Sequence, residues 1–374
     1  MKIQILILTI AVCALAYPGD YVNYLVGADK ENFDIYSGYL NVTNPDPKTL
    51  KKQIHYVLVE TRGDDPEEAP VIVVVNSGGP GCSSLLSMFM ENGPYVWDEL
   101  TDKFAQNPYS WNQRANVLYL AGLPGVGYSF AADKANKQFN DVQSAQDHFD
   151  ALMEFFKKFP TLADNPIYIS GSLYGGIMAP YLAWKIHEYN TNAEITKKVK
   201  IPFKGIMVGN PITHHEYDTI NSLWPFAYMN NLMDFDTWFT LEEDNCTSYY
   251  RNLKPAHLTQ ACIAALEDFQ ETTERINFYD IYRDLPSVGA QGLTSRVGTV
   301  KDLEGNTHFY DKGVLMSEFT PWLADTLSPQ NNVRFGDGLT EYLNGYEFRR
   351  EMNIPTTMQA FRGCEMDFDW HYDI

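Results

Sequence analysis

The chain has 374 residues, 45% of them hydrophobic and 14% aromatic, which is enough apolar material for one large core or two modest ones. Its 48 acidic residues against 28 basic ones give a formal charge of −20. A negative charge of this size argues against nucleic acid and against an anionic membrane as partners.

The first 16 residues have the pattern of a secretory signal peptide. Lys2 precedes an apolar run from Ile3 to Leu15, and the small residues around Leu15 suit cleavage after Ala16. The run is short for a membrane span, and a retained anchor is the alternative. We therefore predict no membrane partner and a mature domain of residues 17–374 in the secretory pathway, either extracellular or in a lysosome or vacuole.

Three strands are predicted in the first part of this domain. The run HYVLVE at 55–60 alternates loosely, as in a half-buried strand, and the run VIVVV within 69–84 is apolar throughout, as in a central strand. A third strand, ANVLYL, is predicted at 115–120. The glycines that follow the central strand could bind an oxyanion through backbone N–H groups, although a glycine-rich turn after a strand more often has no binding role.

An alternation of helices and strands follows. A helix is predicted at 142–159, because apolar residues recur on one face and Pro160 ends it. The stretch IYISGSLYGGIMAP at 167–180 indicates a strand, a sharp turn and a helix, and a further strand is predicted at 204–208. This order predicts βαβ units, and hence an α/β fold with a largely parallel sheet. Beyond Pro211 the alternation stops, and the following segment, rich in aromatic and acidic residues, is predicted to be an insertion over the sheet.

The cysteines predict two disulfides. Cys13 leaves with the signal peptide, and an even number remains for an oxidising compartment. The four remaining cysteines allow three connectivities, one of which joins Cys82 to Cys364 and Cys246 to Cys262. Sequons at Asn41 and Asn245 predict glycosylation. Metal-ligand spacings such as C-x-x-C and H-E-x-x-H do not occur in the sequence, so we predict neither a metal site nor a cofactor.

Several longer motifs occur together in a fixed order: NSGGPGCSS (76–84), NPYSWN (107–112), GVGYSF (125–130), FFKKFP (155–160) and GSLYGG (171–176). In this order they resemble the serine carboxypeptidases, a family with yeast vacuolar and animal lysosomal members. The similarity runs from YSGYL at 36–40 to YLNGYEFRREMNIP at 342–355. It implies an α/β-hydrolase fold, with a mostly parallel central sheet, helices on both faces and a cap insertion at about 212–330. It also implies hydrolytic release of C-terminal residues from peptides at acidic pH by a Ser-Asp-His triad.

The resemblance assigns catalytic roles residue by residue. The family's nucleophile turn reads G-E-S-Y-[AG]-G, so Leu173 stands at the nucleophile position. The oxyanion hole would use the backbone N–H groups of Gly79 and Tyr174. Leucine cannot attack a carbonyl, and the neighbouring Ser172 precedes the apex of the turn, where it would point away from the pocket. The resemblance therefore implies a vacant nucleophile position.

Recognition of the substrate carboxylate is implied to be weakened as well. The family binds this group with an asparagine and two glutamates held partly protonated. Here Ser77 replaces the asparagine and Ser172 replaces one glutamate, while Glu91 remains. Loss of the partner carboxylate removes the like charge that would keep Glu91 protonated.

The C-terminal part supports the pairing of Cys82 with Cys364, which the family also has. The sequence given stops at Ile374, so the resemblance implies truncation, with the last core strands and the triad Asp and His missing. Loss of those strands would leave an apolar sheet edge that favours a protein partner or a homodimer. Two functional classes remain open at this point: a non-catalytic member that binds peptide C-termini or a protein, and an active serine-type carboxypeptidase with a substituted site.

Overall fold

The computed structural model describes residues 18–28, 32–42, 52–63, 65–78, 80–98, 101, 103–131, 138–214, 218, 220–244, 246, 259–273, 276, 281–282, 297–301, 307–311, 337–364 and 369–371. The predicted signal peptide, Gly79 and Asn245 lie outside them.

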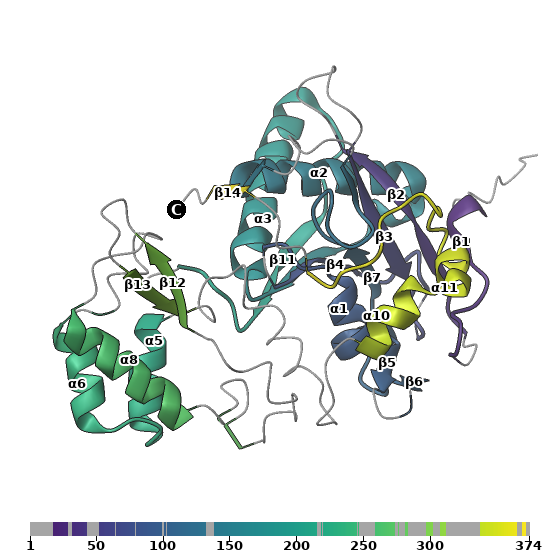
Figure 1. Ribbon diagram of the computed structural model, residues 1–374. Helices are drawn as coiled ribbons and strands as arrows, with labels where there is room; N and C mark the ends of the chain where they lie inside the picture. The colour runs from purple at the N-terminus through teal and green to yellow at the C-terminus, as the bar shows by residue number, and fades with distance from the viewer. Residues whose placement is uncertain are drawn as a thin grey trace, which may run out of the picture.

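Strands and helices alternate through the middle of the chain (Figure 1). The strands are β1 (Tyr21–Val22), β2 (Ile35–Val42), β3 (Lys52–Val59), β4 (Val71–Ser77), β5 (Tyr95–Asp98), β6 (Lys103–Gln106), β7 (Asn116–Leu120), β8 (Phe130–Ala131), β9 (Gln138–Asn140), β10 (Ile167–Ser172), β11 (Phe203–Gly209), β12 (Val297–Lys301), β13 (Thr307–Asp311) and β14 (Asp369–His371). The helices are α1 (Leu85–Ser87), α2 (Asp141–Lys158), α3 (Gly175–Thr196), α5 (Ile220–Met229), α6 (Phe235–Glu243), α8 (Gln260–Thr273), α10 (Asp337–Asn344) and α11 (Tyr346–Glu351). Each strand and helix predicted before Pro211 is present, with bounds shifted by a few residues, except that α3, predicted from about Gly176 to Tyr189, ends at Thr196.

The main sheet has the strand order β1-β2-β3-β7-β4-β10-β11, with β8 paired to β3. Strands β7, β4, β10 and β11 run parallel to one another, whereas β1, β2 and β3 form an antiparallel extension that pairs with β7 through β3. The sheet is therefore mixed, with the predicted parallel part at its centre. Strand β4 lies in the middle of that part, and Val71, Val73, Val74 and Val75 are all nearly inaccessible to solvent. Burial on both faces explains the uninterrupted apolar run in the sequence.

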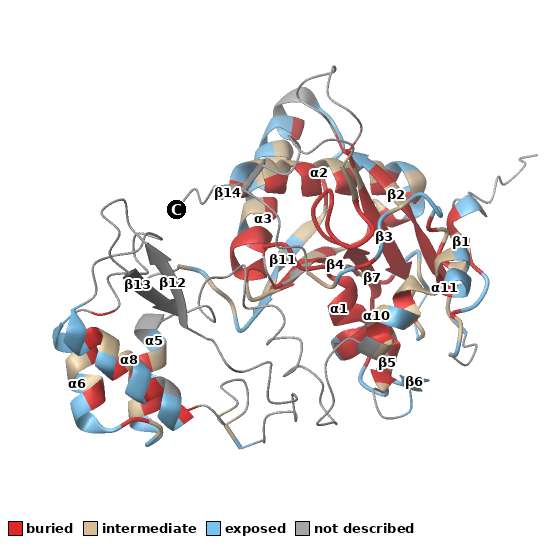
Figure 2. Cartoon of the chain, in the orientation of Figure 1, coloured by how far each residue is buried: buried red, intermediate tan, exposed pale blue. Residues whose placement is uncertain are grey.

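Helices cover both faces of the sheet, as predicted (Figure 2). Val73 of β4 joins a core cluster with residues of α2 and α3, including Phe155 and Met178. Its neighbour Val74 points to the opposite face and joins a second cluster with residues of α1, α10 and α11. Because successive strand residues point to opposite faces, one strand contributes to both cores.

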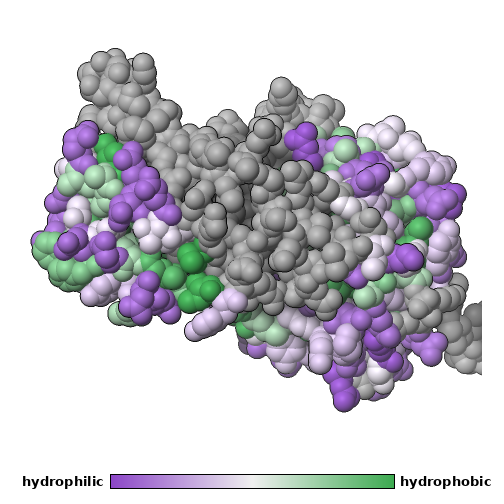
Figure 3. Space-filling model, turned by 60° about the horizontal axis from the view of Figure 1, so that its bottom comes forward, coloured by the Kyte–Doolittle hydropathy of each residue, from purple (hydrophilic) through white to green (hydrophobic). Residues whose placement is uncertain are grey.

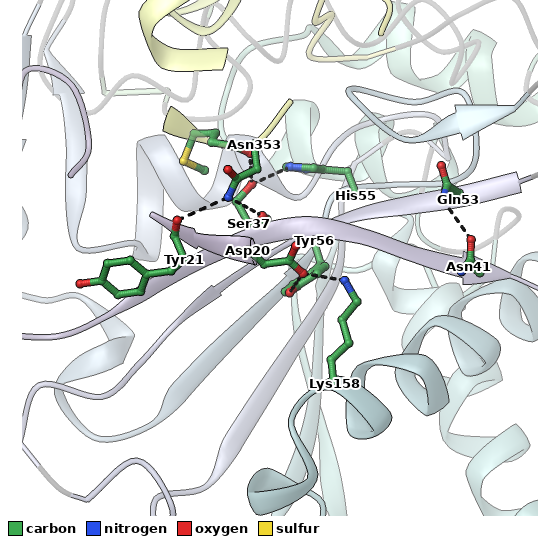
Figure 4. Close-up of polar contacts among 10 residues, drawn as sticks. Asp20, Tyr21, Ser37, Asn41, Gln53, His55, Tyr56, Lys158 and Asn353 are labelled. Carbon is green, nitrogen blue, oxygen red and sulfur yellow. Dashed lines mark hydrogen bonds and ion pairs between the residues drawn. The ribbon is translucent and has the colours of Figure 1, made fainter. Parts of the chain in front are cut away.

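Helix α2 shows why the sequence pattern identified it. Asn140 caps its start and accepts a hydrogen bond from the Gln143 backbone N–H at 2.7 Å. Lys157 and Lys158 lie in its last turn, where the helix dipole favours positive charge. The Lys158 ammonium also contacts the carboxylate of Asp20 at 2.6 Å (Figure 4), which joins the helix to the N-terminal end of the domain.

The buried face of α2 also carries a histidine whose titration couples stability to pH. Burial lowers the pKa of His148 to about 4. Between that value and the unfolded value of 6.5, the unfolded chain binds more protons than the folded protein, so stability falls as pH drops through this window.

We expect His148→Gln to remove about 2 kcal/mol of the stability difference between pH 7 and pH 5. Urea unfolding of both proteins at the two pH values measures this. The exposed His187→Gln in α3 is the matched control and should behave as the parent protein does. Equal pH dependence of the His148 variant and the parent would contradict the prediction.

Strand β11 forms an edge of the main sheet. Within the described part of the chain it pairs with β10 alone, and its Ile206 and Val208 are 44% and 40% exposed. The expected protein partner or homodimer at an apolar sheet edge stays a prediction.

Helices α5, α6 and α8 form a separate group to one side of the sheet (Figure 1). Trp224, Leu241 and Phe269 belong to a small core of their own. The predicted disulfide between Cys246 and Cys262 joins the end of α6 to α8. The assignment of this region as a cap stays a prediction. Among the described residues, none of the helices combines the length and the apolar character that a bilayer crossing requires.

Candidate active site

The candidate site is the sharp turn between β10 and α3. Strand β10 ends at Ser172, helix α3 begins at Gly175, and Leu173 between them has a φ of 53°. Left-handed backbone costs a non-glycine residue about 1–2 kcal/mol. The turn therefore places its central side chain in a strained conformation, as the nucleophile turn of hydrolases does. The strand before and the helix after agree with the sequence prediction.

Backbone hydrogen bonds hold the apex in place. The Leu173 N–H donates to the Gly209 carbonyl at 3.2 Å, and the Leu173 carbonyl accepts from the Ile212 N–H at 2.8 Å. Both partners lie at the end of β11 or just beyond it. The end of the neighbouring strand therefore keeps the turn in its strained geometry.

Glycines allow the strand, turn and helix to approach closely. A Cβ on Gly171 would lie 2.7 Å from the Cα of Gly175, and a Cβ on Gly176 would lie 2.4 Å from the Cβ of Pro211. Neither glycine has a positive φ, so the requirement is space rather than backbone freedom.

Tyr174, which follows the apex, is held in place through its side chain. Its side chain is fully buried, and its hydroxyl donates to the Asp141 carboxylate at 2.6 Å. Asp141 is itself buried in the first turn of α2. This contact joins the start of α2 to the start of α3. Sequence reasoning missed it, because a tyrosine and an aspartate 33 positions apart leave no periodic signal.

The structure brings the two serine positions of the expected carboxylate site together. Ser172 of β10 is the parallel register partner of Ser77 of β4, and each residue ends its strand. Ligands of α/β sheets bind at the carboxyl ends of parallel strands. Ser77, Ser172 and Leu173 therefore share the edge where a ligand would lie. The expected oxyanion contribution of Gly79 lies outside the described residues.

Glu91 lies in a π-helical turn, Met88–Asn92, which follows α1. Its carboxylate accepts a hydrogen bond from the Ser87 hydroxyl at 2.9 Å. Part of the residue stays exposed, yet the protein packed around the carboxylate raises its pKa by desolvation, and the Ser87 hydrogen bond offsets this in part. The pKa of Glu91 is thus raised without a neighbouring carboxylate, the cause that the family resemblance implied.

The disulfide between Cys82 and Cys364 is present, as predicted. It links the loop after β4 to the segment that follows α11. The Ser83 N–H also donates to the Gly363 carbonyl at 2.8 Å. The loop that begins beside the candidate site is therefore fixed to the C-terminal segment.

One buried serine–histidine pair looks like part of a catalytic triad but is structural. The Ser37 hydroxyl lies 2.9 Å from Nε2 of His55, and both residues are inaccessible to solvent (Figure 4). The same hydroxyl donates its proton to the Met352 carbonyl at 2.6 Å, so it accepts rather than donates in its contact with His55. Burial lowers the pKa of His55 to about 3, which keeps the ring neutral. The pair joins strands β2 and β3 to the end of α11.

No cluster of three or more His, Cys, Asp or Glu side chains suited to a metal ion occurs within the described ranges. The predicted absence of a metal site and of a cofactor stays a prediction.

The chain is similar to known proteins over most of its length. The family model described as serine carboxypeptidase matches residues 26–374. The lysosomal protective protein of Mus musculus is 29% identical over 376 residues, which cover 94% of this chain and 71% of that protein. Serine carboxypeptidase-like 21 of Arabidopsis thaliana is 33% identical over 249 residues, covering 66% of this chain and 48% of the plant protein. The chain thus spans about half the length of the plant relative.

A solved structure carries the same fold. The prohormone-processing carboxypeptidase from Saccharomyces cerevisiae matches with a TM-score of 0.66 and 18% identity, over 94% of this chain and 71% of that chain. At this identity the match supports the α/β-hydrolase fold.

Proposed function

Because the chain belongs to the serine carboxypeptidase family, we propose that it binds the C-termini of peptides without hydrolysing them. The observation that carries the proposal is Leu173 at the apex of the turn, with a φ of 53°. The backbone has the strained form that presents a nucleophile, and the side chain presented has no reacting atom. The alternative is an active serine-type carboxypeptidase in which another group replaces the nucleophile.

Glu91 supports carboxylate binding at acidic pH. A protonated carboxylic acid can donate a hydrogen bond to a substrate carboxylate, and burial raises the pKa of Glu91. Ser77 and Ser172, adjacent in register, would add hydroxyl donors in place of the family's asparagine and glutamate. We expect weaker binding than in a member with all three family groups, and tighter binding as the pH falls.

The proposed location is the secretory route, either outside the cell or in a lysosome or vacuole. Two disulfides support an oxidising compartment, and the mouse relative is named as lysosomal. The proposal also includes a protein partner or a second copy of the chain, supported by the exposed Ile206 and Val208 on edge strand β11.

The activity test uses the purified chain at about pH 5, where the family's chemistry operates. A blocked dipeptide should give no turnover above the buffer blank, and a serine-directed phosphonate should leave no adduct in the intact mass. A stoichiometric adduct on Ser172 or measurable turnover would support the active alternative instead.

Binding is tested with a fluorescent peptide that carries a free C-terminal carboxylate and with its C-terminal amide. Fluorescence polarisation should detect the acid with at least about tenfold higher affinity than the amide. Glu91→Gln should remove the pH dependence of binding, whereas Glu188→Gln on α3 should leave it unchanged. Equal affinity for the acid and the amide would contradict carboxylate recognition, whatever the result of the activity test.

A further inference from the structure

Helices α5 and α6 carry an aromatic surface, formed by the exposed Phe235 and Phe239 and by the partly buried Tyr228 and Trp238. Their rings form a continuous chain: Tyr228 stacks on Trp238 with centroids 4.5 Å apart, and Phe235 stacks on Phe239 at 5.6 Å. Phe235 also contacts Trp238 at 5.8 Å, which joins the two stacks. Phe235 and Phe239 are 53% and 47% exposed, and Met229, next to Tyr228, is 79% exposed.

The helical group has a core of its own, so a lack of core packing does not explain why these rings are exposed. The helical group already buries Trp224, Leu241 and Phe269 in its own cluster, and a disulfide joins α6 to α8. Trp238 also packs against this cluster, so it is the exposed rings of Phe235 and Phe239 that are additional to the group's own packing. Contiguous exposed apolar side chains of this kind mark interaction sites more often than scattered ones do.

The helical group that carries the aromatic surface is acidic. Within 220–244, 246 and 259–273 the described chain has no Lys or Arg, and its acidic residues are Asp234, Asp236, Glu242, Glu243, Asp244, Glu267, Asp268 and Glu271. Phe235, Phe239 and Glu242 follow each other at i, i+4 and i+7, so they lie on one face of α6. Figure 3 shows hydrophobic and hydrophilic residues side by side on the face of this group that is in view.

From this surface we propose that α5 and α6 bind a basic amphipathic segment of another protein. Its apolar side chains would pack on Phe235 and Phe239, and its Lys and Arg would pair with Glu242 and Glu243 or lie over the aromatic faces, where cations are stabilised. The same charge disfavours an anionic membrane, and it disfavours a second copy, because acidic rims would face each other. This proposal does not depend on the vacant turn at Leu173.

The test uses a synthetic amphipathic helix of leucine and lysine as the probe, with a leucine and glutamate helix as its counterpart. Isothermal titration of the full chain should detect the lysine peptide and not the glutamate peptide. Phe235→Ser with Phe239→Ser should weaken binding at least about tenfold. Tyr109→Ser with Trp184→Ser, which removes aromatic rings that are 86% and 59% exposed elsewhere, should leave it unchanged.

Charge-reversal variants separate the effect of the charges on α6 from the effect of the net charge of the protein. Glu242→Lys with Glu243→Lys should also weaken binding about tenfold at low salt, and the difference should shrink as salt increases. Because these positions end α6, added positive charge there suits the helix dipole and preserves the fold. Glu188→Lys with Glu194→Lys on α3 changes the net charge equally and should have little effect.

Three results would overturn the proposal. The first is equal loss of binding in the α3 and α6 charge variants, which would indicate attraction by overall charge. The second is binding to phosphatidylserine vesicles that the Phe235 and Phe239 variant abolishes, which would identify a lipid surface. The third is a dimer in sedimentation that the same variant dissociates, which would identify a second copy.

Discussion

Replacing Cys82 and Cys364 together by alanine is expected to lower the free energy of unfolding by about 5 kcal/mol. The bond joins residues 282 positions apart, so it restricts a large loop of the unfolded chain. The entropy lost on closing a loop rises with the logarithm of its length, and a loop this long lies at the upper end of measured effects, near 5 kcal/mol. Non-reducing urea unfolding measures the change.

The second disulfide provides a matched control. Cys246 and Cys262 are 16 positions apart, and their replacement by alanine should cost about 3 kcal/mol. Loss of the 82–364 bond should also loosen the packing of α10 and α11, which precede Cys364. Leu343 and Phe348 of these helices are buried in the core cluster that contains residues of β7. An equal or smaller cost for the 82–364 pair would contradict the prediction.

Gly176→Ala is expected to destabilise the protein by about 3 kcal/mol and to displace the candidate site. The added Cβ would meet the Cβ of Pro211 at 2.4 Å and the carbonyl oxygen of Ile212 at 2.6 Å. These are a proline ring and a backbone atom, which cannot rotate away, and overpacking of this kind costs about 1–3 kcal/mol. Ile212 also donates to the Leu173 carbonyl, so any shift is transmitted to the apex of the turn.

Gly209→Ala is the matched control for this substitution. A Cβ on Gly209 meets nothing within 4 Å, and the residue lies at the end of the neighbouring strand. Thermal unfolding of both variants should separate them by several degrees. A Gly176 variant as stable as the Gly209 variant would mean that α3 and the loop after β11 can move apart without cost.

The sequence predicted the parts of the fold that repeat locally. The uninterrupted apolar run of β4 is typical of a strand buried on both faces, the one-sided apolar pattern of α2 follows from a period of 3.6 residues, and both elements are present. The turn at Leu173 could be placed because glycines on both sides leave a mark in the sequence. Its left-handed backbone at a leucine could not, since it depends on tertiary hydrogen bonds to Gly209 and Ile212 at the end of β11.

The contacts that sequence reasoning missed are tertiary. The Tyr174–Asp141 hydrogen bond, and the burial that raises the pKa of Glu91, depend on how distant elements meet. The aromatic surface on α5 and α6 was visible only as composition, a segment rich in aromatic and acidic residues. Which of those rings are exposed depends on which others fill the small core of that helical group.

The contacts of Met352 and Asn353 have a consequence for the way the protein is made. The Met352 carbonyl accepts from the Ser37 hydroxyl, and the Asn353 amide donates to the Ser37 carbonyl at 3.1 Å, across more than 300 residues of sequence. A ribosome adds about 5–20 residues per second, so β2 waits roughly 15–60 s for these partners to emerge. During that time the apolar surface that α10 and α11 later cover stays exposed to solvent. The nascent chain is therefore exposed to aggregation through that surface until the last helices emerge.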